Sequence, residues 1–164
     1  MSLFEYSVDV AKPLETVYAQ WADFESYPYF MEGIRAVHQL SDIRLLWLGE
    51  LGHDECEWFA EITEQKLNQR IAWKSTSGAR YDGRVIFRPL DYENTRVILQ
   101  IDYDPRGYVE NVPAVLAAFQ RRMAEDLQRF KTYIEDRSYR AGVWRGKAQQ
   151  SMAQMMMASS IWMR

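Results

Sequence analysis

Six segments between residues 34 and 103 have the pattern of short strands separated by polar turns, and the segment that follows them has a different pattern. The six are IRAVHQLS, IRLLWLGEL, ECEWFAEITEQ, RIAWKSTS, YDGRVIFRPL and TRVILQIDY, separated by short polar turns. Alternation with a period of two predicts strands, and strands in succession favour an antiparallel meander. From Val115 to Ile134 the apolar residues recur every three or four positions instead, which predicts one long amphipathic helix.

The residues before the meander predict a further strand and two short helices. LFEYSVDV, residues 3–10, alternates in the same way as the later strands. Pro13 suits the first turn of a helix that continues to Trp21, and a second short helical turn in DFESYPYF is interrupted by Pro28. The predicted order is therefore one strand, two short helices, six strands and one long helix, without an internal repeat.

Length and charge narrow the classes of protein to which the chain can belong. A length of 164 residues suits one domain, predicted to span residues 1–146, with a methionine-rich tail at 147–164. With 20 basic and 23 acidic residues, the net charge of -3 offers no general attraction to nucleic acid, so no nucleic-acid partner is expected. The single cysteine excludes an internal disulfide, and no signal segment or bilayer-spanning run is visible. We therefore expect a cytoplasmic protein.

The sequence provides little support for a catalytic or metal centre. No GxGxxG, GxxxxGK or GxSxG motif is present, and two histidines with one cysteine make no ligand cluster, so no metal, cofactor or catalytic residue is predicted. Cys56 lies among apolar residues, which raise the pKa of a thiol and make it a poor nucleophile. His38 alternates with Ala36 and Leu40 and is read either as a hydrogen-bonded structural residue or as a side chain facing the interior, whereas His53 lies in a turn.

Several stretches, together with the order of the elements, resemble the polyketide cyclase/dehydrase branch of the START-like, or SRPBCC, superfamily. The resemblance covers residues 3 to about 146 and is carried by WADFESYPYFMEGI, EWFAEITEQ, RIAWKSTSG, FRPL, TRVILQIDYDPRG and DLQRFKTYIEDR. Phe59, where related chains often carry an acidic residue, and the methionine-rich end depart from the family pattern.

This resemblance implies an α+β helix-grip fold, in which a curved seven-stranded antiparallel sheet wraps around the long C-terminal helix and leaves an apolar cavity. Family members bind lipids, quinones, polyketides or hormones, so the expected partner is a hydrophobic small molecule. A polyketide cyclase or dehydrase that uses tyrosines and water for acid–base catalysis is the alternative. An accessory protein with a vestigial cavity is a third interpretation.

Strand parity predicts which side chains face such a cavity. The inward set mixes large with small residues, and this mixture leaves either interdigitated packing or empty volume. The predicted ligand-binding residues are Phe30, Trp47, Trp58, Ala60, Trp73, Ser75, Tyr81, Gly83, Val85, Tyr103, Leu116, Phe119 and Met123. Arg80, Arg84, Arg88 and Arg96 fall on the opposite face, where Glu57 and Glu61 are the expected ion-pair partners.

Two further segments have alternative interpretations. Phe24, Tyr27, Tyr29, Phe30 and Met31 form either a lid over the cavity mouth, with Gly33 as its hinge, or a hydrophobic staple that closes the end of the sheet. The tail SMAQMMMASSIWMR is read either as a flexible end that touches the domain or another copy in a homodimer, or as a helix that docks on a partner or membrane interface.

Overall fold

The computed structural model describes residues 2–51 and 54–136 and contains two compact units, Met1–Lys131 and Thr132–Arg164, which we consider separately. His53, the boundary predicted after residue 146 and the tail at 147–164 lie outside the described residues.

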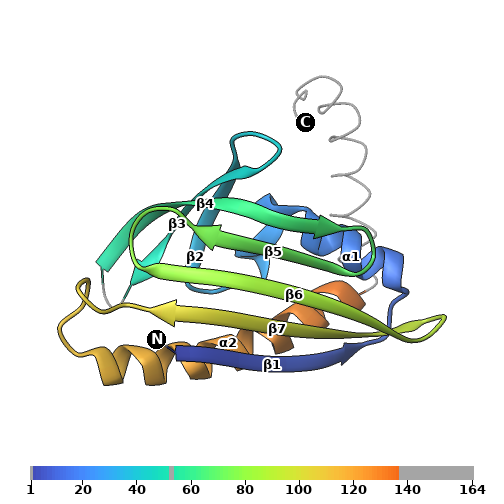
Figure 1. Cartoon of the computed structure of the whole chain (residues 1–164). Coiled ribbons are helices and arrows are strands. Elements are labelled where there is room, and N and C mark those ends of the chain that lie inside the picture. The colour runs from blue at the N-terminus through green and yellow to red at the C-terminus, as the bar shows by residue number, and fades with distance from the viewer. Residues whose placement is uncertain (1, 52–53, 137–164) are drawn as a thin grey trace. The chain divides into compact units, whose positions relative to one another are not determined.

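The first unit contains a seven-stranded antiparallel sheet and its helices (Figure 1). In chain order the elements are β1 (Ser2–Val10), α1 (Leu14–Ala22), the 3-10 helix η1 (Phe24–Tyr29), β2 (Ile34–Gln39), β3 (Arg44–Leu51), β4 (Asp54–Lys66), β5 (Arg70–Ser75), β6 (Arg80–Asp91), β7 (Asn94–Asp104) and α2 (Val112–Glu135), of which the residues up to Lys131 belong to this unit. The strands follow the order β1-β7-β6-β5-β4-β3-β2. The expected helix-grip fold and the predicted order of elements are confirmed.

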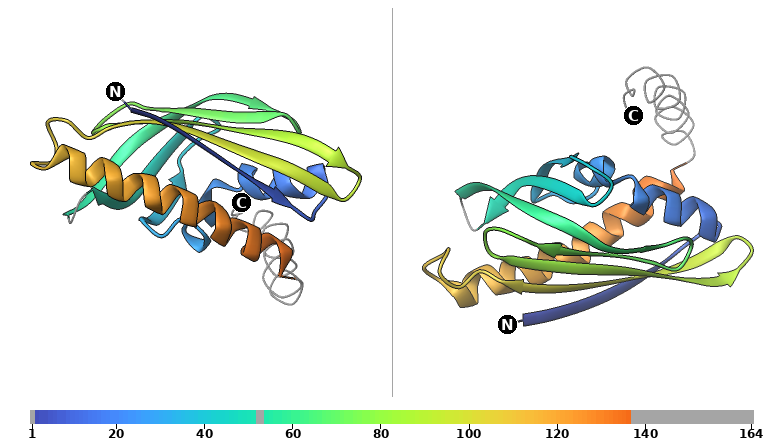
Figure 2. Two further views of the ribbon diagram at one scale, coloured as in Figure 1. Left: turned by 90° about the horizontal axis from the view of Figure 1, so that it is seen from below. Right: turned by 45° about the horizontal axis from the view of Figure 1, so that its top comes forward.

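The helices of this unit all lie against one face of the sheet, which we call the inner face (Figure 2). Pro13 precedes α1 with a φ of -64°, which suits the start of a helix. Asn111 caps α2, because its side-chain oxygen accepts a hydrogen bond from the Ala114 N–H at 3.1 Å. Phe119 of α2 contacts Phe4 of β1, with ring centroids 5.3 Å apart, so the helix is anchored on the sheet by aromatic packing.

Alternation along β7 separates the two faces of the sheet as predicted. Its buried inward residues are Val97, Leu99, Ile101 and Tyr103. The four arginines predicted on the outer face are exposed there. The predicted pairing was wrong for Arg80 and Arg96. Arg80 pairs with Asp82 of its own strand and with Asp102 on β7, and Arg96 pairs with Asp9, its direct neighbour across the β1–β7 ladder, rather than with Glu57 or Glu61.

A register shift in β2 corrects the prediction for His38. The pairing of β2 with β3 shifts between Ile34 and Ala36, which exchanges the faces of the residues that follow. Val37 therefore points inward opposite Trp47, whereas His38 is exposed. The histidine is neither buried nor directed toward the interior.

Most apolar side chains of η1 and of the two residues that follow it are part of the core. Phe24, Tyr27, Phe30 and Met31 are buried, and Tyr29 alone of the predicted lid residues is exposed. The Tyr27 hydroxyl donates a hydrogen bond to the Trp21 carbonyl oxygen at 2.8 Å. Phe30 contacts Phe130 of α2 edge-on, with centroids 4.9 Å apart. This packing favours the staple interpretation over the lid.

Among the residues that the structure describes, no helix combines the length and hydropathy needed to cross a membrane.

Candidate functional site

A pocket of about 170 Å³ lies between the inner face of the sheet and α2. Its walls come from β2 to β4, the β5–β6 turn, β6, β7, the loop after β7, and α2. The lining residues are Gly33, Ile34, Glu50, Cys56, Glu57, Trp58, Gly78, Ala79, Tyr81, Tyr103, Tyr108, Phe119, Arg122 and Asp126. Glu50, Glu57, Gly78 and Tyr108 are exposed and form the mouth, whereas Trp58 and Tyr103 are buried deeper in the wall.

Aromatic rings form the apolar wall of the pocket. Tyr81 of β6 lies between Trp58, at a centroid distance of 5.5 Å, and Phe119, at 5.9 Å. Tyr103 of β7 lies 4.3 Å from Phe119 and 5.9 Å from Tyr81. Behind this wall, Trp47 stacks on Trp58 with an interplanar angle of 13°. Because each ring is held by its neighbours, the wall presents rigid apolar surface to a ligand.

Arg122 and Asp126 of α2 add charge to this apolar wall. Arg122 Nη1 lies 3.7 Å from Glu50 Oε1 on β3. A Cβ atom on Gly33 would lie 2.5 Å from Arg122 Nη1, so only a glycine leaves room for the guanidinium at its present position. Neither residue is predicted from the sequence, because both flank the apolar stripe of the helix. Their spacing of four residues, which places them on one side of α2, was the available signal.

Asp126 connects α2 to the segment that precedes β2. Its Oδ1 atom accepts a hydrogen bond from the Glu32 N–H at 3.1 Å and also contacts Arg129 Nη2. Burial raises the pKa of the Asp126 carboxyl above its ordinary value, while the hydrogen bonds from Arg129 and Glu32 and the charges of Arg129 and Arg122 act in the opposite direction. The pocket therefore contains a carboxyl group, that of Asp126, which binds a proton more readily than an exposed aspartate does.

Tyr81, Tyr103 and Cys56, which also line the pocket, are held in their neutral forms. Burial, followed by the charge of Asp126, raises the pKa of Tyr81 well above that of a free phenol. Burial raises the pKa of Tyr103 to about 12, with a further contribution from Cys56. Burial, followed by the charge of Asp54, also raises the pKa of the Cys56 thiol. Near neutral pH the two tyrosines can thus donate hydrogen bonds but cannot serve as bases.

Four of the predicted ligand-binding residues line this pocket: Trp58, Tyr81, Tyr103 and Phe119. The structure places the other nine elsewhere. Buried in the core are Phe30, Trp47, Ala60, Trp73, Gly83, Val85 and Met123, and half-buried are Ser75 and Leu116. The Ser75 hydroxyl, predicted to orient a ligand oxygen, instead donates to Asp82 Oδ1 at 3.1 Å and accepts the Tyr81 N–H at 3.0 Å.

Trp58 and Trp73 therefore have different surroundings. Trp58 is a wall of the pocket, whereas Trp73 is 2% exposed and packs against β6 at Gly83. Tyr108 and the glutamates at the mouth were not predicted, because loop residues and exposed acidic residues carry no periodic signal.

The described part of the chain, residues 2–51 and 54–136, brings together no group of three or more histidine, cysteine, aspartate and glutamate side chains that could hold a metal ion.

Comparison with known proteins adds a sequence family and a set of related folds. A sequence profile described as "Polyketide cyclase / dehydrase and lipid transport" matches residues 10–132. An uncharacterized 17.2 kDa protein of Streptomyces lincolnensis is 40% identical over 147 residues, which cover 89% of this chain and 98% of that protein.

Solved structures resemble the fold at lower identity. The Zhui aromatase/cyclase from Streptomyces sp. R1128 superimposes with a TM-score of 0.70 at 19% identity, covering 86% of this chain and 98% of that one. A START superfamily protein from Mycobacterium smegmatis gives a TM-score of 0.65 at 18% identity, covering 82% of this chain and 95% of that one.

Proposed function

We propose that this chain, which belongs to the START-like family of polyketide cyclases, dehydrases and lipid-transport proteins, binds a hydrophobic, ring-containing small molecule between its sheet and α2. The observation that carries the proposal is the aromatic wall of Trp58, Tyr81, Tyr103 and Phe119 around a volume of about 170 Å³. Rigid rings supply apolar area with little loss of side-chain freedom, and each buried Å² contributes about 25 cal/mol.

The polar atoms of the wall would fix the orientation of the guest. Neutral Tyr81 and Tyr103 hydroxyls can donate to a carbonyl or ether oxygen, and the half-buried Arg122 guanidinium offers further donors. A flat, mostly apolar ligand with one or two oxygen atoms matches this combination best.

Tryptophan fluorescence tests the proposal directly, because Trp58 lines the pocket. Titration of the wild-type protein with a panel of quinones and fatty acids is expected to give a saturable change for at least one ring-containing ligand. Ala79 also lines the pocket, so Ala79→Phe should fill it and abolish the change. Ala117→Phe, at an exposed position on α2, is the matched control and should leave binding intact. A wild-type protein without a saturable response to the panel contradicts the proposal.

A cyclase or dehydrase activity on a ketone-bearing chain is the second candidate function. The observation that favours it is the placement of Asp126, with its raised pKa, on the same pocket wall as Tyr81. A protonated carboxyl or a neutral phenol can supply a proton to a developing alkoxide or enolate.

Turnover of a ketone-bearing substrate mimic by the wild type, Tyr81→Phe and Asp126→Asn tests this candidate. We expect each substitution to lower kcat by about a hundredfold or more if its group transfers a proton. Turnover that is unaffected by both substitutions excludes these residues from the chemistry.

A further inference from the structure

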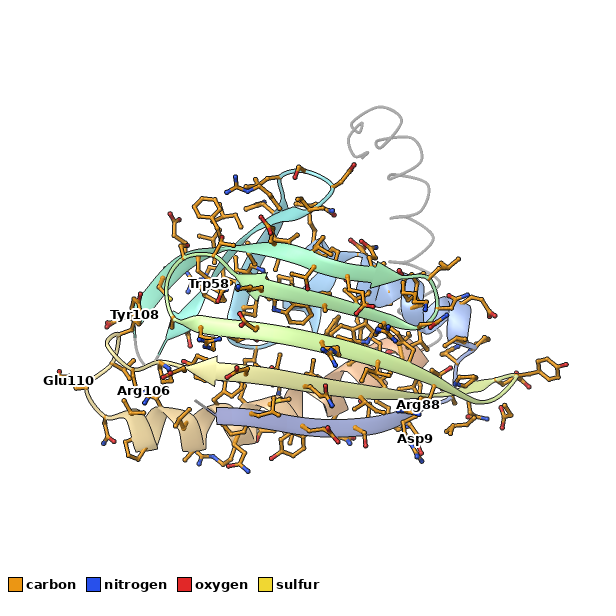
Figure 3. All side chains as sticks on the ribbon, viewed as in Figure 1. Asp9, Trp58, Arg88, Arg106, Tyr108 and Glu110 are labelled. Atoms are coloured by element: carbon orange, nitrogen blue, oxygen red, sulfur yellow. The ribbon has the colours of Figure 1, made fainter. Side chains whose placement is uncertain are left out.

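Tyr108 is an aromatic residue that lines the pocket although 55% of it is exposed. It belongs to the loop between β7 and α2, and Figure 3 shows it at the end of the sheet where this loop lies. Single exposed aromatic residues are common and need no explanation by themselves. Tyr92, for example, is 95% exposed at the β6–β7 turn and does not line the pocket. The position of Tyr108 at the mouth is what distinguishes it.

The loop that carries Tyr108 is held by its own hydrogen bonds. The Asp104 carboxylate accepts hydrogen bonds from the Arg106 N–H at 3.0 Å, from Nε at 2.9 Å and from Nη2 at 2.6 Å. The Tyr108 N–H donates to the Pro105 carbonyl oxygen at 2.9 Å, and Arg106 pairs with Val109 in an isolated bridge. The backbone therefore presents the ring at the mouth before any ligand arrives, which reduces the entropy lost on binding.

The volume of the pocket limits how much of a ligand it can enclose. Its 170 Å³ is close to the roughly 150 Å³ of an apolar cavity that accepts one benzene ring. Pockets that enclose a whole drug-sized ligand measure about 300–1,000 Å³. A ligand larger than one ring therefore extends through the mouth, where an exposed apolar surface is available on Tyr108.

We infer that the pocket encloses only the ring-shaped head of a longer ligand, and that Tyr108 selects for length because the apolar part outside the pocket packs on its ring. This inference rests on the proposed binding function and narrows it to one ligand class, a single ring joined to an extended apolar tail. Tyr108 is then a specificity-determining residue that contributes little to the affinity for a ligand without a tail.

Calorimetric titration with 4-methylphenol and 4-hexylphenol tests the inference on the full chain. Burial of about 50 Å² of tail against a tyrosine ring corresponds to roughly an eightfold change in Kd. The wild type should bind 4-hexylphenol more tightly than 4-methylphenol. Tyr108→Ser should raise the Kd of 4-hexylphenol about eightfold and that of 4-methylphenol by less than about twofold. Tyr108→Phe, which keeps the ring, should behave like the wild type.

Tyr92→Ser is the matched control, since it removes an exposed ring from another turn. Tyr92→Ser should leave the Kd of both phenols unchanged. Tyr108→Ser, Tyr108→Phe and Tyr92→Ser should all unfold at the wild-type temperature, because each substituted side chain is exposed. Equal effects of Tyr108→Ser on both phenols, or no effect on either, overturn the role of Tyr108 while the proposed function stands. Failure of both phenols to bind the wild type overturns the proposed function and this inference together.

Discussion

The Trp73 indole packs against β6 because Gly83 has no side chain. A Cβ atom at Gly83 would lie 2.2 Å from Trp73 Cζ2, far inside van der Waals contact. Trp73 and Gly83 are paired directly across β5 and β6, so neither backbone can move away without breaking the ladder between them. This single contact places Trp73 in the core, while Trp58 on the neighbouring strand remains beside the pocket.

Substitution of Gly83 tests this contact. Gly83→Ala should lower the free energy of unfolding by about 1–3 kcal/mol, because the added methyl group would clash with the buried indole of Trp73. Chemical denaturation measures the change, and Arg84→Ala, at the adjacent exposed position, should alter stability by less than about 0.5 kcal/mol. Equal stability of Gly83→Ala and the wild type would show that Trp73 is not confined as described.

Cys56 reports on the pocket through its reactivity. Because burial and Asp54 raise the pKa of its thiol, the thiolate fraction near neutral pH is lower than for a free cysteine. The rate of alkylation should therefore rise with a midpoint above the ordinary cysteine pKa of about 8.5. A ligand in the pocket should slow the reaction, since Cys56 is one of its lining residues. A midpoint at or below the ordinary value, measured with iodoacetamide on this single-cysteine chain, contradicts the assignment.

At the scale of elements, one side of α2 holds the segment between η1 and β2. Asp126 accepts the Glu32 N–H, Arg129 Nε donates to the Phe30 carbonyl oxygen at 3.4 Å, and Arg122 lies against Gly33. This segment supplies Gly33 to the pocket wall, so charged residues of the helix fix a part of the site that aromatic packing does not reach. The polar contacts thus position the wall as well as lining it.

The raised pKa of Asp126 predicts a dependence of stability on pH. A carboxyl whose pKa is higher in the folded than in the unfolded state binds its proton more tightly when folded. Its contribution to stability is complete below the unfolded pKa of about 3.9 and is lost as pH rises through the higher folded value. Relative to Asp126→Asn, the wild type should therefore lose stability as pH increases from about 4, by about 1.4 kcal/mol for each unit by which the pKa is raised.

Denaturation of both proteins across this pH range measures the difference. The comparison isolates Asp126 because Arg122, Arg129 and Glu32 are common to both chains. A stability difference that grows in favour of the wild type with rising pH would mean that the ion pair with Arg129 outweighs burial and that the pKa is lowered.

The elements could be predicted from the sequence because their signals are local. Alternation in TRVILQIDY places Val97, Leu99 and Ile101 on the inner face without knowledge of any other strand. The face of His38 could not be predicted, because the register shift in β2 depends on its pairing with β3. The sequence also could not show which inward side chains line the pocket and which belong to the core. Trp73 belongs to the core because it packs on Gly83, a residue of another strand.

At the scale of the whole molecule, ligand binding depends on incomplete closure of the sheet against α2. The core extends from α1 and η1 along the inner face, where Trp21 packs on Phe130 with centroids 4.9 Å apart. The pocket lies at the other end of the inner face, beside the loop between β7 and α2. A ligand that binds there stabilises the folded chain by RT ln(1 + [L]/Kd), about 2.7 kcal/mol at a hundred times Kd.

The most direct test of this central claim is the two-dimensional ¹H–¹⁵N NMR spectrum of the indole groups during titration with 4-methylphenol. The chain has six tryptophans, and single Trp→Phe variants assign their resonances. We predict that the Trp58 indole resonance shifts and saturates, because its ring lines the pocket, while that of Trp21, which is 0% exposed and does not line it, stays in place. A titration in which the Trp58 resonance does not move, or moves without saturation alongside Trp21, contradicts the account.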